Sequence, residues 1–447
     1  MCGITISKSD RIIYRRFAFV MAYHLSSAPV RFRFAAGLGL LVPRRRLSYV
    51  LGIETSCDDT GIAIVDTDGR VHSNVLYSQQ EFHTRYGGII PPRAQDLHRA
   101  RIEDAYNRCL VEADLRPEQL TAIAVTNRPG LPLSLLVGLR FARHLARKLQ
   151  KPLLPVHHME AHALQARMEN ISAISFPFLC LLISGGHCQL ALVRGPGRLT
   201  LLGQTLDDAP GEAFDKIARR LRLYVLPQYR AWNGGQAIEH AAQSAVCPDA
   251  YDFPLPLAQQ RNCNFSFAGI KNNSFRAIRA RERLEQTPPD GIISNYSDFC
   301  AGLLQAVSRH LMHRTQRALE YCLRTENGLF GDASPTLVVS GGVANNDVIY
   351  RNIEHLAGQY NCRSYRPFKR YCSDNGVMIA WHGIEQLLAN SAKHLRFDYH
   401  NIDIQGSAGF KDSSVEDVTR SAIKCKWIKP LDHLRGRATA EAGHCDA

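Results

Sequence analysis

One arrangement of strands and turns occurs twice in this chain of 447 residues. An apolar run, a short polar turn and a second apolar run follow one another at 49–65 and again at 178–193. In each half, helical segments and a further buried strand come next, the strand lying at 121–125 or at 336–339. Strands that alternate with helices form largely parallel sheets with helices on their faces. The sequence therefore predicts an α/β fold of two similar lobes.

The remaining periodicity places helices and a short strand between these runs. We expect helices at 93–113, 133–149, 212–221, 236–243, 296–322 and 343–357, and a strand at 153–156. The stretch 224–232 and the chain after 395 show weak periodicity and are expected to be loop and C-terminal extension. Two facing lobes would bring both strand-turn-strand tips to one cleft, which is where open α/β sheets bind ligands.

The positive charge is concentrated at the N-terminus. Residues 1–48 hold eight Arg and one Lys against a single acid, and so contribute +8 of the net charge of +13. An Arg-rich, acid-poor leader that contains Ser is typical of an organelle transit peptide. Its apolar stretches at 17–23 and 34–42 are far shorter than a membrane helix needs, so we expect no membrane insertion. A basic tail without a targeting role is the alternative.

The cysteines argue against a zinc-finger or dithiol site. The 13 Cys are spread along the whole chain without a C-x-x-C pair. This usage fits a reducing compartment, in which most thiols behave as small apolar side chains.

Two histidines, His158 and His162, stand one helical turn apart if a helix begins near 158. This i, i+4 spacing suits two imidazoles on one metal ion, although an amphipathic helix start with satisfied histidines fits it equally well. The zinc-protease motif H-E-x-x-H needs Glu directly after the first His, whereas Glu160 lies two places later. A metallopeptidase is therefore disfavoured.

Two glycine-rich turns, Ser184–His187 and Ser340–Val343, occupy equivalent places in the second half of the chain. Glycines let the backbone approach phosphate oxygens, although such turns are also common in ordinary hairpins. Acids and amides gather at element ends, at 58–59, 212–215, 345–346 and 374–375, where helix capping is the competing explanation. No Walker motif G-x-x-x-x-G-K-[ST] is present. For the arginines at 276–283 the pattern alone favours a solvated surface over nucleic acid.

Seven segments in order between residues 52 and 383 resemble the TsaD family of tRNA N6-adenosine threonylcarbamoyltransferases, in its mitochondrial, O-sialoglycoprotein endopeptidase-like branch. They read GIETSCDDTGIAIVD, HHMEAHAL, LLISGGH, GEAFDKIARRL, NFSFAGIK, SGGVANN and CSDNGVMIAWHG. The resemblance implies an α/β fold of the actin-like, Hsp70 and sugar-kinase (ASKHA) class, with two duplicated mixed-sheet lobes and an interlobe cleft. It divides the chain into a cleaved transit peptide at 1–48, an N-terminal lobe at 49–157, a C-terminal lobe at 158–395 whose last helix packs back on the first lobe, and an extension at 396–447.

The resemblance also implies the reaction and the site. The family transfers threonylcarbamoyl from threonylcarbamoyl-AMP to N6 of adenosine 37 in tRNA, here in mitochondrial tRNAs reading ANN codons. One divalent metal ion per subunit, iron or zinc, is expected on three ligands, and the adenylate on eight residues. The metal ligands are His158, His162 and Asp374, and the adenylate residues are Leu182, Ile183, Ser184, Gly185, Gly186, Asp215, Gly235 and Asn346.

The chain departs from the family pattern in three places. The P-G-G element reads Asn233-Gly234-Gly235 after an insertion from Tyr224, Pro91-Pro92 replaces the usual Pro-Glu, and Arg128 stands where Gly is common. The first departure makes Gly235 the least secure assignment, and the other two lie outside the expected ligand positions and are interpreted as variation within the branch.

Several functional points stay open at this level. Asp58 is the candidate general base because its turn should face the cleft, and a turn-capping role is the alternative. The expected partners are tRNA, threonylcarbamoyl-AMP and a second copy of the chain in a homodimer, and the expected compartment is the mitochondrial matrix. An ASKHA-type ATPase or phosphotransferase is the alternative function, and it would turn over ATP without needing His158.

Overall fold

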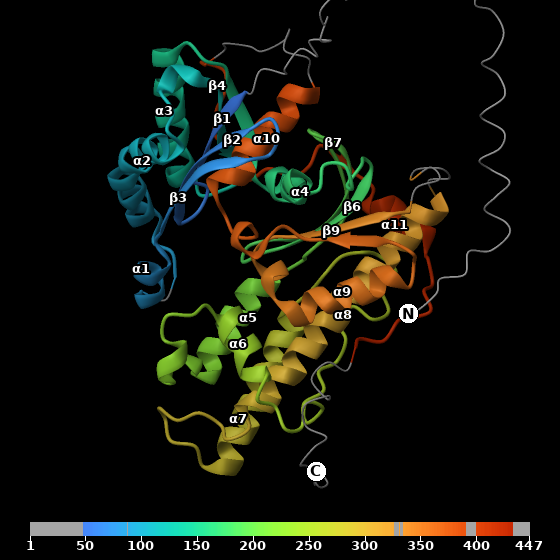
Figure 1. Ribbon diagram of the computed structural model, residues 1–447. Helices are drawn as coiled ribbons and strands as arrows, with labels where there is room; N and C mark the ends of the chain where they lie inside the picture. The colour runs from blue at the N-terminus through green and yellow to red at the C-terminus, as the bar shows by residue number, and fades with distance from the viewer. Residues whose placement is uncertain (1–47, 87, 326–329, 331–333, 390–398, 432–447) are drawn as a thin grey trace, which may run out of the picture. The chain divides into compact units, whose positions relative to one another are not determined.

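The computed structural model describes residues 48–86, 88–325, 330, 334–389 and 399–431 (Figure 1). The predicted leader at 1–48 lies outside these residues, apart from Ser48. Among the helices in the described ranges, none combines the length and apolarity needed to cross a membrane.

The first sheet has five strands in the order β3-β2-β1-β4-β5. The neighbours β1/β2 and β2/β3 are antiparallel, whereas β1/β4 and β4/β5 are parallel. Its strands are β1 (Tyr49–Glu54), β2 (Asp59–Asp66), β3 (Val71–Ser78), β4 (Leu120–Arg128) and β5 (Leu153–His157). The helices of this lobe are α1 (Gln80–Arg85), α2 (Pro91–Ala113) and α3 (Pro132–Leu149), with a 3-10 turn, η1 (Pro117–Gln119), before β4.

The second sheet repeats this order. Its strands run β10-β9-β6-β7-β8-β11, so that β6, β7 and β8 form the antiparallel set and β9 and β10 the parallel one. The strands are β6 (Phe178–Ile183), β7 (Cys188–Gly195), β8 (Arg198–Gln204), β9 (Thr336–Ser340), β10 (Arg363–Tyr365) and β11 (Asp412–Ser413). The predicted duplication is therefore confirmed.

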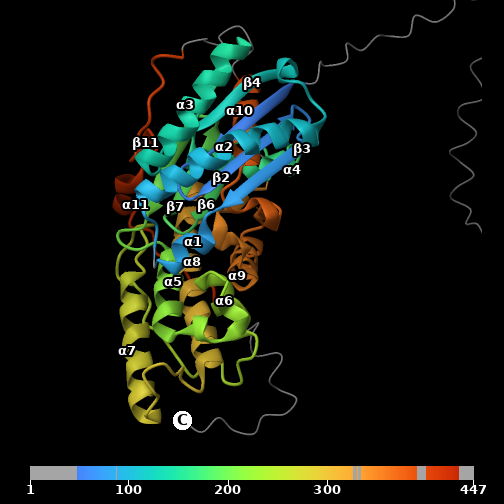
Figure 2. The same ribbon diagram turned by 90° about the vertical axis from the view of Figure 1, so that its left-hand side faces the viewer.

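Eight helices and four 3-10 turns follow β5 in the described residues. They are α4 (His158–Glu169), α5 (Pro210–Leu221), α6 (Gly234–Ala242), α7 (Ala268–Glu285), α8 (Tyr296–Thr325), α9 (Asp347–Gly358), α10 (Gly376–Ala389) and α11 (Val415–Ser421), with η2 (Leu223–Val225), η3 (Pro227–Tyr229), η4 (Gly342–Asn345) and η5 (Lys369–Tyr371). Figures 1 and 2 show α5, α6, α8 and α9 on one side of the second sheet and α4 and α10 on its other side.

Three apolar cores follow from the alternation of side chains along the strands. Leu51 and Ile53 point to α2 and α3, whereas Val50 belongs to the core of α4 and α10. That middle core also contains Phe178 and Val338 of the second sheet, so α4 and α10 join the two lobes. A third core packs the outer face of the second sheet against α5, α6, α8 and α9. Helix α10 itself packs on β1, β2 and β4.

The C-terminal part of the described chain contacts both lobes. The main-chain N–H of Gln405 donates to Asn127 O at 2.9 Å, and that of Gly130 donates to Gly406 O at 3.1 Å, in the first lobe. Strand β11 then pairs with β8 of the second sheet, and the backbone beyond α11 accepts a hydrogen bond from Gln316 on α8. We refer to residues 399–431 as the strap.

Four expectations about elements were incomplete or wrong. The third strand of each sheet, β3 or β8, was not expected. The helix expected at 343–357 begins at 347, because 342–345 form the 3-10 turn η4 and Asn346 caps the helix by accepting from Ile349 N at 3.0 Å. The loop expected at 224–232 contains the 3-10 turn η3 and most of η2, which begins one residue earlier. The chain after 395 contains β11 and α11, because the second sheet offers an edge to pair with.

Candidate metal centre and adenylate site

The two predicted histidines share one face of α4. The helix begins at His158 directly after β5, and the rings of His158 and His162 lie 4.7 Å apart between centroids, at 90° to each other. Both side chains are almost fully buried, with 8% and 1% exposure. The i, i+4 spacing therefore brings two imidazoles together below the carboxyl end of the first sheet.

Asp374 reaches these histidines because α10 docks tightly on β1 and β2. A Cβ on Gly376 would lie 2.5 Å from Ala63 N, and a Cβ on Gly52 would lie 2.1 Å from Gly376 O. Backbone therefore packs on backbone there, and only glycine fits. Asn375 fixes the preceding turn, since its Oδ1 accepts from Met378 N at 3.0 Å and its Nδ2 donates to Tyr371 O at 3.0 Å.

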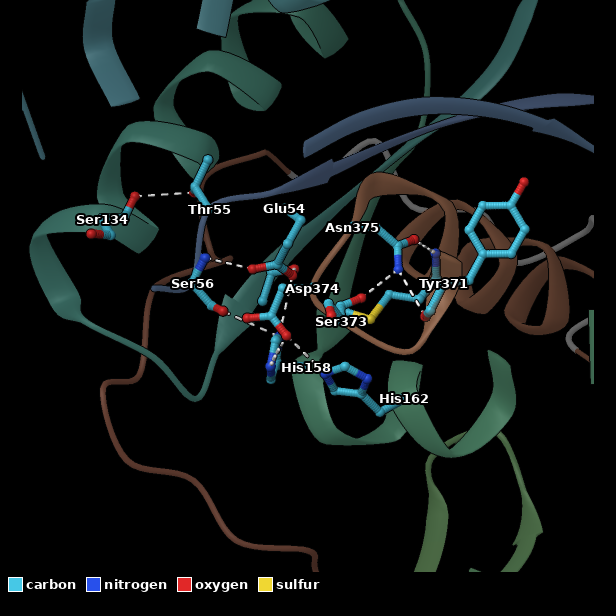
Figure 3. Close-up of polar contacts among 12 residues, drawn as sticks. Glu54, Thr55, Ser56, Ser134, His158, His162, Tyr371, Ser373, Asp374 and Asn375 are labelled. Atoms are coloured by element: carbon cyan, nitrogen blue, oxygen red, sulfur yellow. Dashed lines mark hydrogen bonds and ion pairs between the residues drawn. The ribbon is translucent and has the colours of Figure 1, made fainter. Parts of the chain in front are cut away.

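Figure 3 shows the three side chains converging. Asp374 Oδ1 lies 3.0 Å from His162 Nε2 and 3.5 Å from His158 Nε2. One ligand atom from each of the three residues falls within 4.8 Å of the others. Two ligands on a tetrahedral ion with bonds of roughly 2.0–2.2 Å are roughly 3.4 Å apart, so the donor set fits a zinc- or iron-sized ion.

The electrostatics of the site favour a cation. Burial acts to raise the pKa of Asp374, but His158 and His162 hold that pKa well below its usual range. Burial acts to lower the pKa of His158, but Asp374 and Glu54 raise it to about 9. A divalent ion that replaces this proton would be balanced by two carboxylates.

Glu54 is a site residue that sequence reasoning missed. It ends β1, is 1% exposed, and lies with Oε2 3.2 Å from His158 Nδ1. The same oxygen accepts from Thr126 Oγ1 at 2.5 Å. The other oxygen, Oε1, accepts from Ser56 N at 2.5 Å (Figure 3). A carboxylate on the far nitrogen of a ligating histidine fixes its tautomer and orientation. The available signal was the position of Glu54 at the carboxyl end of a parallel strand, beside the ends of β4 and β5.

The predicted adenylate turn lies at the end of β6 in the second lobe. Leu182 and Ile183 are buried strand residues, whereas Gly185 and Gly186 are exposed, and a Cβ on either glycine would contact nothing within 4 Å. The turn is closed by Ser184 N donating to His187 O at 2.9 Å. Its backbone is therefore free to approach a ligand.

His187 connects this turn electrostatically to the metal centre. Burial, together with the neighbouring His158 and His162, lowers the pKa of His187 to about 4. The turn is therefore coupled through His187 to all three candidate ligands, since Asp374 also acts on this pKa.

The other adenylate residues come from three helices. Asp215 on α5 accepts from Gly234 N at 2.7 Å, which places Gly235 at the start of α6. Asn346 caps α9, and its Nδ2 is buried without a hydrogen-bond partner among the described residues. Glu239 Oε1 accepts from Asp347 N at 2.6 Å and so ties α6 to α9. A cavity of about 300 Å³ opens between these helices, lined by Trp232, Gln236, Glu239, His240, Gln243, Asp347 and Lys369.

Asp58 lies in the turn between β1 and β2. Burial raises the pKa of this carboxyl, and Asp374 adds to the increase, which places the turn close to the metal centre.

The two glycine turns of the second lobe also adjoin each other, since a Cβ on Gly341 would lie 2.3 Å from Ile183 O.

The repeated sheets, with a His-His-Asp group at the carboxyl end of the first and a glycine turn at the end of the second, define a two-lobe α/β protein of the ASKHA class. A profile of the family "TsaD: tRNA N6-adenosine threonylcarbamoyltransferase" matches residues 70–381. The chain is 80% identical over 388 residues to the Drosophila melanogaster protein named "Probable tRNA N6-adenosine threonylcarbamoyltransferase, mitochondrial", covering 87% of this chain and 95% of that one. This chain belongs to the TsaD family.

Two more distant relatives carry corresponding names. The Homo sapiens protein named "tRNA N6-adenosine threonylcarbamoyltransferase, mitochondrial" is 46% identical over 85% of this chain and 90% of its own length. The Rhizobium johnstonii protein named "tRNA N6-adenosine threonylcarbamoyltransferase" is 40% identical over 77% and 90%. The family and fold expected from the sequence motifs are thereby confirmed, and the chain is a transferase.

Proposed function

We propose that this protein transfers threonylcarbamoyl from threonylcarbamoyl-AMP to N6 of adenosine 37 in mitochondrial tRNAs that read ANN codons. Membership of the TsaD family supports the reaction, and the mitochondrial names of the animal relatives support the compartment, which we take to be the matrix. The observation that carries the proposal is the meeting of His158, His162 and Asp374, to which His187 of the exposed glycine turn is electrostatically coupled.

The reaction is an acyl transfer in which the adenosine amine attacks the carbamoyl carbon and AMP leaves. His158, His162 and Asp374 would hold one divalent ion, iron or zinc, which supplies Lewis-acid polarisation of the carbamoyl group. The exposed main chain of Gly185 and Gly186 receives the phosphate, because no side chain blocks its N–H groups.

The remaining polar groups orient the nucleotide. The partnerless Nδ2 of Asn346 and the carboxylate of Asp215 are available to ribose hydroxyls or nearby polar atoms. Asp58 is the proposed proton acceptor for the attacking amine, since its pKa is raised by burial. The enzyme is proposed to act as a homodimer.

The test combines the purified protein with threonylcarbamoyl-AMP and an unmodified tRNA transcript, and detects the modified nucleoside by mass spectrometry. His162→Ala should abolish transfer and stoichiometric metal binding, because it removes one of three ligands. His144→Ala, which removes an exposed histidine from α3, is the control and should retain both. Thermal unfolding of each variant checks that the fold is intact.

Two outcomes would contradict the proposal. Full transfer by pure, metal-depleted protein would exclude the metal role. Turnover of ATP to ADP that survives His158→Ala, with no modified nucleoside formed, would favour a phosphotransferase of the same fold.

A further inference from the structure

Helix α7 presents three arginines on one exposed face. Arg276, Arg279 and Arg283 are all exposed, and at about 100° per residue they fall within an arc of about 60°. The opposite face, with Ile270, Ser274 and Ile278, is buried. We call the three residues the arginine stripe.

No acid neutralises the arginine stripe in the described part of the chain. The two glutamates of α7 are both engaged elsewhere: Glu282 pairs with Arg220 at 2.6 Å and Arg222 at 2.9 Å, and Glu285 pairs with Arg281 at 2.5 Å. By contrast, none of the three stripe guanidiniums forms an ion pair or hydrogen bond with another described residue. The stripe is therefore an uncompensated row of three positive charges.

Helix α7 starts beside the adenylate site. Asp207 Oδ1 accepts from Phe267 N at 2.7 Å, and the Asp208 carboxylate bridges Lys216 of α5 and Lys271 of α7. At the start of α5, a Cβ on Gly211 would lie 2.8 Å from Gly185 Cα. The stripe therefore begins about 12 Å along α7 from this contact region, at a rise of 1.5 Å per residue, and continues outward for about 10 Å more.

We infer that the arginine stripe binds the phosphate backbone of the tRNA whose adenosine occupies the site. The inference rests on the proposed function, because that function brings an RNA to this end of α7. A row of forked guanidiniums matches a polyanion with regularly repeated phosphates. The contact is independent of base sequence, since the stripe offers charge without an exposed aromatic side chain on α7.

A membrane surface fits the same helix less well. Leu284 is the one large apolar side chain on α7 that is strongly exposed, at 74%. An interfacial helix needs a continuous apolar face to insert below the lipid headgroups, and the apolar face of α7 is already buried in the protein.

The test is the triple variant Arg276→Gln/Arg279→Gln/Arg283→Gln of the full chain. Its affinity for an unmodified tRNA transcript is measured by titration at several salt concentrations, together with steady-state kinetics. KM for tRNA should rise about tenfold, and the slope of log K against log salt should flatten by about 2. The value of kcat at saturating tRNA and KM for threonylcarbamoyl-AMP should stay as in the wild type. The matched control, Arg93→Gln/Arg99→Gln/Arg101→Gln on α2, removes the same exposed charge and should leave the slope unchanged.

Each outcome separates the stripe from the enzyme activity. If the wild type catalyses transfer and the stripe variant keeps the tRNA affinity and salt slope of the wild type, the inference is overturned. The proposed function would then still stand. Absence of transfer by the wild type would tell against the proposed function instead. Loss of binding to vesicles of anionic lipid, with tRNA affinity intact, would assign the stripe to a membrane and overturn the inference.

Discussion

Replacing Glu54 with glutamine should weaken metal binding without unfolding the protein. The carboxylate of Glu54 faces His158 Nδ1 at 3.2 Å and accepts hydrogen bonds from Ser56 N and Thr126 Oγ1. Glutamine has nearly the same shape, but one of its two terminal atoms is a donor group. It must therefore turn an N–H toward a group that already donates, and it removes a negative charge from behind the imidazole.

The magnitude follows from this role. Loss of a hydrogen-bonding partner behind a metal ligand typically costs about 10- to 100-fold in metal affinity, which is about 1.4 to 2.7 kcal/mol of binding free energy. Since Glu54 also helps to raise the pKa of His158, the variant should hold the proton of this imidazole less tightly. Both effects act on one side chain and leave His162 and Asp374 in place.

The assay is competition for Zn²⁺, or for Fe²⁺ without oxygen, against a chromophoric chelator, with transfer activity measured in parallel. Thr126→Val is the control, because it removes one donor to Glu54 but leaves the charge and the contact with His158. Its metal affinity should stay within about threefold of the wild type. A folded Glu54→Gln protein that binds metal as tightly as the wild type would refute the positioning role of Glu54.

Three further predictions concern the adenylate turn, the docking of α10 and the response to acid. Gly211→Ala should raise KM for threonylcarbamoyl-AMP about tenfold or more, because its Cβ would lie 2.8 Å from Gly185 Cα and must push the turn aside; an unchanged KM would show that the turn tolerates the shift. Gly376→Ala should lower the free energy of unfolding, measured by urea denaturation, by about 1–3 kcal/mol, since its Cβ would lie 2.5 Å from Ala63 N. An unfolding midpoint equal to that of the wild type would contradict this packing. Burial, together with Arg314 and Arg317, lowers the pKa of His313 to about 3. As the pH falls below about 6.5, His313 is therefore protonated in the unfolded chain but not in the folded one. The free energy of unfolding should therefore decrease from about pH 6.5 towards pH 3. In His313→Gln this decrease should be smaller, as measured by urea denaturation at several pH values in this range.

Long, fully apolar runs made the two-lobe architecture predictable from the sequence. Strands β1 and β6 are buried along almost their whole length, and such runs stand out against polar turns. Strand β3 was missed because it is half exposed and mixes polar with apolar residues, and β8 because its burial is interrupted in the same way. The start of α9 was misplaced because the 3-10 turn η4 lies between the glycine turn and the helix, which begins only after its cap Asn346.

The candidate site was only partly visible for a physical reason. The spacing of His158 and His162 is local, so helical geometry alone suggested that they lie together. Asp374 is 212 positions from His162, and only the packing of α10 on the first sheet brings it there. No local pattern encodes that contact, and it was expected solely from the resemblance to a family. Glu54 was overlooked because a carboxylate at a strand end looks like part of a polar turn.

The strap has a consequence for how far the lobes can separate. Its last hydrogen bond to the first lobe is at Gly406 and its pairing with β8 begins at Asp412. Six residue steps of extended chain span at most about 22 Å, at 3.3–3.6 Å each. The strap is therefore a tether with a fixed maximum length, and substrate entry that needs a wider opening must first break the hydrogen bonds at Asn127 and Gly130 or unzip β11. Shortening the protein at its C-terminus would remove that limit.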